Sequence, residues 1–418
     1  MTDYAVTYQT EPTNALAAAT TAYIPICSVY SGAQNATEAN CQQKWPYADT
    51  FSKLRVYVSA NTANFANTVT FRNNGADGNQ TVSITASTTG WFEDTTNSDT
   101  IAADDLINWK IVGAAGTGTA TCRGINVKCV TATNGRVWIG GFAPATSSLA
   151  TASVTRYIQG QGLHNYSASL TTTGSAYLAR ACTAKKMRLH VIPNRRITDT
   201  VYTMQKNGSD VTQAVTVGSG GTGWFEDTSN TDSFAAGDYV SYKCVTSTGT
   251  GTIVTASLGA FFEDASGSYN TTVGLSFTQA TNTTRFHDIF GQDSTALSTG
   301  AQAETKMRGS GTIRNVGMYA SSNTSDQTTT FTMRKNGADT AVTFTIAATT
   351  TGAFSDASNS FTYADGDTVC LKSVRAAGGA NTITLTRTFA EIVPDAEAAS
   401  FLPAWARNSN IILGVHRQ

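Results

Sequence analysis

The sequence predicts an all-β protein made of three tandem copies of one two-sheet β-sandwich. Three observations predict this fold. The composition favours strands and turns, one long pattern recurs three times, and each copy contains runs of alternating apolar and polar residues. The 418 residues are enough for two to four domains of ordinary size. No segment of convincing length has a helical period, so strands and turns are expected throughout.

The composition also excludes several classes of protein. Only 14% of the residues are charged, and 36 glycines with abundant Thr, Ser, Ala and Asn take their place. The formal net charge is −1, so neither nucleic acid nor a membrane surface is expected as a partner. A hydrophobic fraction of 40% is enough to build cores and argues against a disordered chain. The first residues lack the basic start of a secretory signal, and no apolar run reaches transmembrane length.

The repeat is defined by glycine, aspartate and lysine at fixed spacings. It starts at an Asn-Gly pair whose glycines are Gly75, Gly208 and Gly337. A second glycine follows at +15 and a lysine at +35. The aspartates at +30 are Asp105, Asp238 and Asp367. The period of 133 and then 129 residues is too long for a solenoid and is the size of a domain.

Alternating runs surround the Asn-Gly pairs. They precede the pairs at residues 53–58, 186–191 and 312–319, and follow at residues 81–85 and 342–346. Asn-Gly between two such runs predicts a β-hairpin, because both turn positions favour positive φ. An apolar strand is expected to close each copy, at residues 137–142, 257–262 and 388–393. About eight strands per copy indicate a two-sheet sandwich.

These features predict the domain organisation. We expect an N-terminal arm over residues 1–20, modules over residues 21–148, 149–266 and 267–394, and a C-terminal arm over residues 395–418. Short apolar segments in the arms must be buried, either by folding back or by holding neighbouring subunits together.

Several phrases resemble known families. Tyr202–Gly208, Gly237–Val240 and Gly259–Phe262 resemble the jelly roll of complement globular heads and tumour necrosis factor. The phrases Arg-Lys-Asn-Gly-Ala-Asp and Thr-Gly-x-Phe-x-Asp are similar to repeats in structural proteins of tailed bacteriophages. The first copy departs from the pattern, with Asp104-Asp105 in place of Gly-Asp. The resemblance implies three jelly rolls packed around a three-fold axis, made either by three chains or by the three modules of one chain.

The repeated carboxylates are interpreted as turn residues. They are the aspartates at +30 together with Asp94, Asp227 and Asp356. Aspartate accepts hydrogen bonds from turn amides, and a domain made three times would keep it in every copy. A calcium site built from these oxygens and a glycosidase pair of carboxylates are the alternatives. We expect no catalytic residue, no cofactor and no metal.

Two aromatic pairs occupy the same place in the first two copies. They are Trp91-Phe92 and Trp224-Phe225, whereas the third copy has Ala353-Phe354. Packing in a core or an interface is the favoured interpretation. The alternative is an aromatic platform for a sugar, as in a receptor-binding fibre.

The remaining polar candidates are interpreted as structural. The four histidines lack metal-ligand spacing, and His190 on the polar side of its strand is expected to be solvated or at an edge. Most of the seven cysteines are expected to be buried, with Cys122–Cys129 or Cys27–Cys41 as optional bridges. A basic cluster is expected to be a solvated strand edge, with docking of an acidic partner as the alternative; it consists of Lys185, Lys186, Arg188, Arg195 and Arg196.

Together these features favour a non-enzymatic structural protein of a tailed-phage virion, exposed on the particle as a capsid decoration, collar or fibre. Its expected partners are other virion proteins, in a homotrimer or an intrachain pseudo-trimer, after assembly in the host cytoplasm. The first alternative is a carbohydrate-binding adhesin or receptor-binding module that recognises a host surface glycan. The second is a glycan-degrading enzyme.

Overall fold

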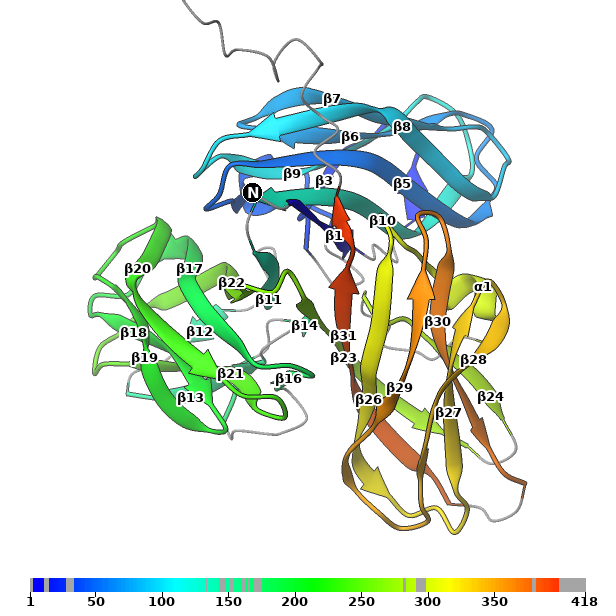
Figure 1. Cartoon of the computed structure of the whole chain (residues 1–418). Helices are drawn as coiled ribbons and strands as arrows, with labels where there is room; N and C mark the ends of the chain where they lie inside the picture. The colour runs from blue at the N-terminus through cyan, green and yellow to red at the C-terminus, as the bar shows by residue number, and fades with distance from the viewer. Residues whose placement is uncertain are drawn as a thin grey trace, which may run out of the picture.

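The three copies fold into three β-sandwiches that form three lobes (Figure 1). The structure is a computed structural model and describes residues 3–10, 15–27, 34–132, 134–142, 148–150, 153–159, 162–163, 166–168, 175–280, 283–290, 298–377 and 381–397. We call the lobes the first sandwich (strands within residues 3–132), the second (135–264) and the third (269–394).

The first sandwich has two sheets. One contains β1 (Asp3–Thr10), β2 (Ala15–Ala17), β5 (Asp49–Asn61), β8 (Gly90–Ile101) and β10 (Thr119–Ala132), with β32 (Ala396–Glu397) at its edge. The other contains β3 (Thr21–Ile24), β4 (Gln43–Lys44), β6 (Asn67–Asn73), β7 (Ala76–Ile84) and β9 (Leu106–Gly113). A short 3-10 helix, η1 (Glu38–Asn40), precedes β4.

The second sandwich repeats this arrangement. Its first sheet contains β11 (Gly135–Phe142), β12 (Ser148–Ala150), β14 (Gly162–Leu163), β17 (Cys182–Asn194), β20 (Gly223–Phe234) and β22 (Thr252–Asp264). Its second contains β13 (Thr155–Gln159), β15 (Tyr166–Ser167), β16 (Ala176–Tyr177), β18 (Thr200–Lys206), β19 (Ser209–Val217) and β21 (Tyr239–Thr246).

The third sandwich does so again. One sheet contains β23 (Tyr269–Gln279), β26 (Gly311–Asn323), β29 (Gly352–Tyr363) and β31 (Ile383–Pro394). The other contains β24 (Thr284–His287), β25 (Thr305–Lys306), β27 (Thr329–Lys335), β28 (Ala338–Ile346) and β30 (Thr368–Arg375). The short helix α1 (Gly300–Ala303) precedes β25.

All three sandwiches have jelly-roll topology. Their first sheets have the orders β1-β10-β5-β8, β11-β22-β17-β20 and β23-β31-β26-β29. Their second sheets have the orders β3-β9-β6-β7, β13-β21-β18-β19 and β24-β30-β27-β28. Eight main strands are thus divided between two four-stranded antiparallel layers in the same way three times, as in a jelly roll. The predicted fold class, tandem jelly-roll sandwiches in an all-β chain, is confirmed.

Strand pairing corrects two expected segment boundaries. Residues 3–10, expected to lie in an arm, form β1 and pair with β10 from Asp3↔Ala132 to Thr10↔Ile125. Residues 137–142, expected to close the first copy, lie in β11 and pair with β22 of the second sandwich, including Gly140↔Gly259. The first sandwich is closed by β10 instead. Of the expected C-terminal arm, residues 398–418 lie outside the described residues, and β32 pairs with β1.

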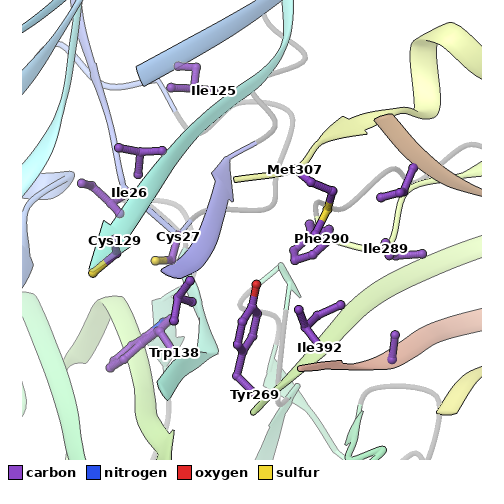
Figure 2. Close-up of a cluster of buried hydrophobic side chains, with 14 of the residues drawn as sticks. Ile26, Cys27, Ile125, Cys129, Trp138, Tyr269, Ile289, Phe290, Met307 and Ile392 are labelled. Atoms are coloured by element: carbon purple, nitrogen blue, oxygen red, sulfur yellow. The ribbon is translucent and has the colours of Figure 1, made fainter. Parts of the chain in front are cut away.

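The cores fill the space between the two sheets of each sandwich. One continuous cluster of buried side chains spans the first and third sandwiches and includes Trp138 and Phe261 of the second. A second cluster fills the second sandwich. Figure 2 shows where residues of all three sandwiches meet in the first cluster, with Cys129 of β10, Trp138 of β11 and Tyr269 of β23 near one another. The Thr7 amide donates to the Tyr269 hydroxyl at 3.2 Å, so β1 and β23 are also joined by a buried hydrogen bond. The lobes therefore share a packed centre.

Candidate assembly interface

The repeated Asn-Gly and Asp residues join two turns in each sandwich. Gly208 has φ of +82° and Asn207 of +52°, as a two-residue type I′ hairpin turn requires. The Asn207 amide donates to Asp238 at 2.6 Å, and the Ala235 amide donates to the other Asp238 oxygen at 2.7 Å. Asn74 and Ala102 make the same contacts with Asp105, and Asn336 and Ala364 make them with Asp367. We call these contacts between the two turns the turn lock. They explain why the aspartate always lies 30 residues after the hairpin glycine.

The lysine at +35 belongs to the same hairpin. Lys110, Lys243 and Lys372 form ion pairs with Asp77, Asp210 and Asp339, two residues after the hairpin glycine. These aspartates are about half exposed. The pairs lie on the surface, where an ion pair contributes about 0–1 kcal/mol.

A second set of aspartates joins the two edge strands of each sandwich. Asp356 accepts from the Thr343 amide of β28 at 2.9 Å, and from the Ser358 and Asn359 amides of its own strand at 3.0 Å. Asp94 and Asp227 do the same in the other sandwiches. Burial alone would raise the pKa of these carboxyls, but the hydrogen bonds hold it below its usual value. Both oxygens of each carboxylate thus hold backbone and amide N–H groups.

The turn lock also holds a short segment that reaches into the next sandwich. The amides of Trp45, Leu178 and Met307 donate to the backbone oxygens of Asp105, Asp238 and Asp367, at 2.7–3.0 Å. We call residues 44–47, 175–180 and 306–309 the contact segments. Each one touches the outer face of the first sheet of the following sandwich, and the three contacts close a ring.

In the first contact, the segment of the first sandwich lies on the second. Lys44 forms an ion pair with Glu226, and its backbone oxygen accepts from Arg188 at 2.8 Å. Arg188, only 2% exposed, also contacts Asp104 at 2.6 Å. Lys186 donates to the Pro46 oxygen at 3.0 Å. The basic cluster expected at a solvated edge thus has two members at an interface inside the chain, because the first sandwich covers that face.

In the second contact, the segment of the second sandwich lies on the third. The Tyr177 ring stacks on Tyr319 at 5.1 Å and on Phe389 at 5.8 Å between ring centres. Arg180 pairs with Glu391 at 2.6 Å. Burial alone would raise the pKa of Glu391, but Arg314 and Arg180 lower it. The buried Arg387 donates to the Ser175 backbone oxygen.

In the third contact, the segment of the third sandwich lies on the first. Lys306 pairs with Glu93 at 2.6 Å, and Arg55 pairs with the same carboxylate at 2.6 Å. Arg308, fully buried, donates to Asn126 of β10 at 2.9 Å. Burial alone would raise the pKa of Glu93, but Lys306 and Arg55 bring it below its usual value.

The aromatic pairs divide between core and surface. Phe92 and Phe225 pack against the two hydrophobic clusters, so they face inward. The neighbouring tryptophans are half-buried on the outer faces. Trp91 lies against Tyr57 at 5.0 Å and 5.9 Å from the Lys306 ammonium. Trp224 stacks on His190 at 4.6 Å with an interplanar angle of 5°. A sugar platform made from both members of a pair does not fit this alternation.

The histidines and cysteines have structural positions. His190, expected to be solvated or at an edge, is only 6% exposed, because Trp224 covers it. His287 is buried against Ser373, and His164 and His416 lie outside the described residues. All seven cysteines are buried and unbridged. Among the described residues, no group of three or more His, Cys, Asp or Glu could hold a metal ion. In that same part of the chain, no helix has the length and apolar character to cross a membrane.

The contact segments were not predicted from the sequence. They carry no recognisable motif, but a signal was present: Lys44 and Lys306 lie at the same distance before their hairpin glycines, as does Tyr177. Extending the alignment upstream of the Asn-Gly pair would have found them.

Comparison with family models finds no match, and comparison with curated proteins finds none. Among solved structures, an archaeal virus protein described by its triple jelly-roll fold and turret assembly is 14% identical, with 93% of this chain and 96% of that chain covered and a TM-score of 0.17. A chain of Sulfolobus turreted icosahedral virus is also 14% identical, with 85% and 82% covered. A chain of the infectious bursal disease virus VP2 subviral particle is 7% identical, with 94% and 81% covered. The latter two TM-scores are also 0.17, and similarity at this level carries no argument about function.

Proposed function

We propose that the chain is a non-enzymatic structural protein of a virus particle, of the tailed-bacteriophage kind, exposed on the surface as a capsid decoration, collar or fibre. The observation that carries the proposal is the closed ring. Each sandwich contacts one neighbour through its contact segment and the other neighbour through the outer face of its first sheet. These contacts join the three lobes of a single chain into one block. The repeated aspartates support a mechanical role, because their oxygens hold turns and edge strands rather than a common cleft.

The particle itself provides the test. An antibody raised against the folded chain should label purified particles in electron micrographs, and the chain should remain with capsids or tails through a density gradient. Mock-infected lysate treated in the same way is the control. Absence of the chain from purified particles would contradict the proposal.

The ring also leads us to propose an intrachain pseudo-trimer rather than a homotrimer. A head-to-tail contact that recurs around an axis closes a ring, and here three copies in one chain suffice. Native mass spectrometry should give a mass near the 43.9 kDa of one chain. A mass about three times larger would instead show that three chains associate.

A carbohydrate-binding adhesin is the second candidate function. It is favoured by the half-buried Trp224, whose ring is held flat against His190 at 4.6 Å, as a stacking surface for a sugar would be. A glycan array should then show binding that the double variant Trp91→Ala, Trp224→Ala abolishes while its circular dichroism stays unchanged. If the chain binds no glycan, the tryptophans serve only to pack the outer faces.

A further inference from the structure

The three contacts that close the ring do not share one chemistry. Lys44, Tyr177 and Lys306 each lie 31 residues before the hairpin glycine of their own copy, so they occupy equivalent positions. Two of these residues are lysines that pair with a glutamate, Glu226 or Glu93. The third is a tyrosine that stacks on two aromatic rings.

The receiving faces differ in the matching way. The first and second sandwiches present an arginine and a glutamate in register across two strands, as Arg55↔Glu93 and Arg188↔Glu226. The third sandwich has Gly317↔Ser355 at this place. A β-carbon on Gly317 would overlap the Phe389 ring, so that ring fills the space an arginine would need.

Each contact segment therefore fits some faces and not others. A lysine placed on the third face would meet Phe389 and Ser355 instead of the glutamate, and its charge would lose water without gaining that ion pair. A tyrosine placed on the first or second face would leave Glu93 or Glu226 without its lysine. Lys44 and Lys306 suit the first and second faces alike, whereas Tyr177 suits the third alone.

We propose that Tyr177, Gly317 and Phe389 are the residues that fix the order of the sandwiches and keep ring closure within one chain. With three identical contacts, any segment would fit any face, and sandwiches of different chains would exchange. The single aromatic contact reduces that degeneracy, because a second copy of the chain offers the Tyr177 segment only one acceptable face and neither lysine segment fits that face. The proposal builds on the intrachain ring and is independent of a role in a virus particle.

Full-length variants test this specificity. Tyr177→Lys removes the match, Tyr177→Phe keeps the stacking ring as the matched control, and a remade third face combines Tyr177→Lys with Gly317→Arg, Ser355→Glu and Phe389→Asn. Asparagine is chosen at position 389 because Phe389 pairs with Gly317 in the third sandwich as Asn126 pairs with Arg55 in the first. Two differently tagged preparations of each variant are unfolded, mixed and refolded, and co-purification of the tags and the thermal midpoint are measured.

We expect the wild type and Tyr177→Phe to refold as monomers without mixing of tags. Tyr177→Lys should lower the thermal midpoint by several degrees and yield mixed oligomers. The remade chain should regain the midpoint and still mix. If Tyr177→Lys does not fold, the remade chain provides the test. A remade chain that folds with a restored midpoint and mixes tags supports the proposal. A remade chain that does not fold, or that stays strictly monomeric, overturns it. Wild-type behaviour of Tyr177→Lys also overturns it. A trimeric wild type would instead contradict the intrachain ring.

Discussion

The Lys306 ammonium lies 2.6 Å from the Glu93 carboxylate, although 213 residues separate them in the chain. Glu93 also receives Arg55, so one carboxylate balances two cations from two sandwiches. Its counterpart Glu226 does the same with Lys44 and Arg188. The contacts between sandwiches, or junctions, therefore contain small ionic networks at the edge of a shared apolar centre. This combination suggests how the junctions respond to mutation and to acid.

Removing the lysine of a junction should cost more than removing a lysine of a hairpin. Lys306→Ala leaves Arg55 and Glu93 without their third partner, and we expect the free energy of unfolding to fall by about 1–2 kcal/mol. The matched control is Lys372→Ala, whose partner Asp339 is half exposed and for which a loss of about 0.5 kcal/mol is expected. Urea denaturation followed by circular dichroism measures both. Equal losses would show that the junction adds nothing to stability.

Substitution of the hairpin glycine should destabilise the protein through its backbone conformation alone. Gly208 has φ of +82°, and a β-carbon at this position would meet open space, so Gly208→Ala should cost about 1–2 kcal/mol through the left-handed conformation. Gly218 has equally open surroundings without a positive φ, and Gly218→Ala should be neutral or slightly stabilising. Thermal unfolding of the two variants side by side distinguishes backbone strain from loss of space. A tolerated Gly208→Ala would contradict this account.

The edge aspartates should be the most sensitive of the repeated residues. Asp356 is 7% exposed and accepts from three backbone amides and the Asn359 side chain. Asp356→Ala leaves these donors unpaired, and we expect a loss of about 2–4 kcal/mol in the free energy of unfolding. Asp339→Ala, at the exposed hairpin, serves as the control. Denaturant unfolding monitored by tryptophan fluorescence gives both values. A loss below that of the control would show that the aspartate does not hold the two edge strands together.

The fold could be predicted because the features that define it are local. Asn-Gly turns and period-two alternation depend on residues adjacent in the chain, and both recur three times. The closing strand of the first copy could not be placed in this way. Its residues Asn126 and Lys128 are polar, yet both are buried, because the third sandwich covers that face. The apolar run at residues 137–142 was a better match to a closing strand, but it forms the first strand of the next sandwich.

The candidate site could be predicted only in part. The aspartates lie in turns and at strand edges because hydrogen bonding within a few residues, or across one hairpin, positions them. The roles of Arg188 and His190 depend on what covers their strand, and a single strand pattern contains no information about its neighbour. His190 was assigned to the polar side of its strand and Arg188 to a solvated strand edge, but Trp224 covers His190 and the first sandwich covers Arg188.

Acid should loosen the junctions. Hydrogen bonds and cations hold the pKa values of Glu93, Glu391 and Glu263 below their usual range, against the effect of burial. Glu263 belongs to the first contact, where it accepts a hydrogen bond from the Tyr47 hydroxyl. A depressed carboxyl pKa contributes stability that is fully present above the unfolded pKa of about 4.3 and is lost as the pH falls through the folded value. Small-angle scattering should therefore show a larger radius of gyration near pH 3 than at pH 7. An unchanged radius with intact far-UV circular dichroism would show that the apolar centre alone holds the lobes together.

At milder acidity the loss of stability should come from histidine. Burial lowers the pKa of His190 to about 4 and that of His287 to about 3, where Arg285 adds to the effect. The unfolded chain takes up these protons below about pH 6.5 while the folded chain does not, so stability falls as the pH drops from about 6.5 towards 4.

His190→Tyr places at this position the residue that already lies against Trp91 in the first sandwich, where the pair is Tyr57 and Trp91. We expect the variant to match the wild type at pH 7 and to lose about 2 kcal/mol less of its stability by pH 4.5. His287 accounts for the decline that remains. Parallel stability curves for the two proteins between pH 7 and 4.5 would show that His190 takes up its proton without opposing the fold.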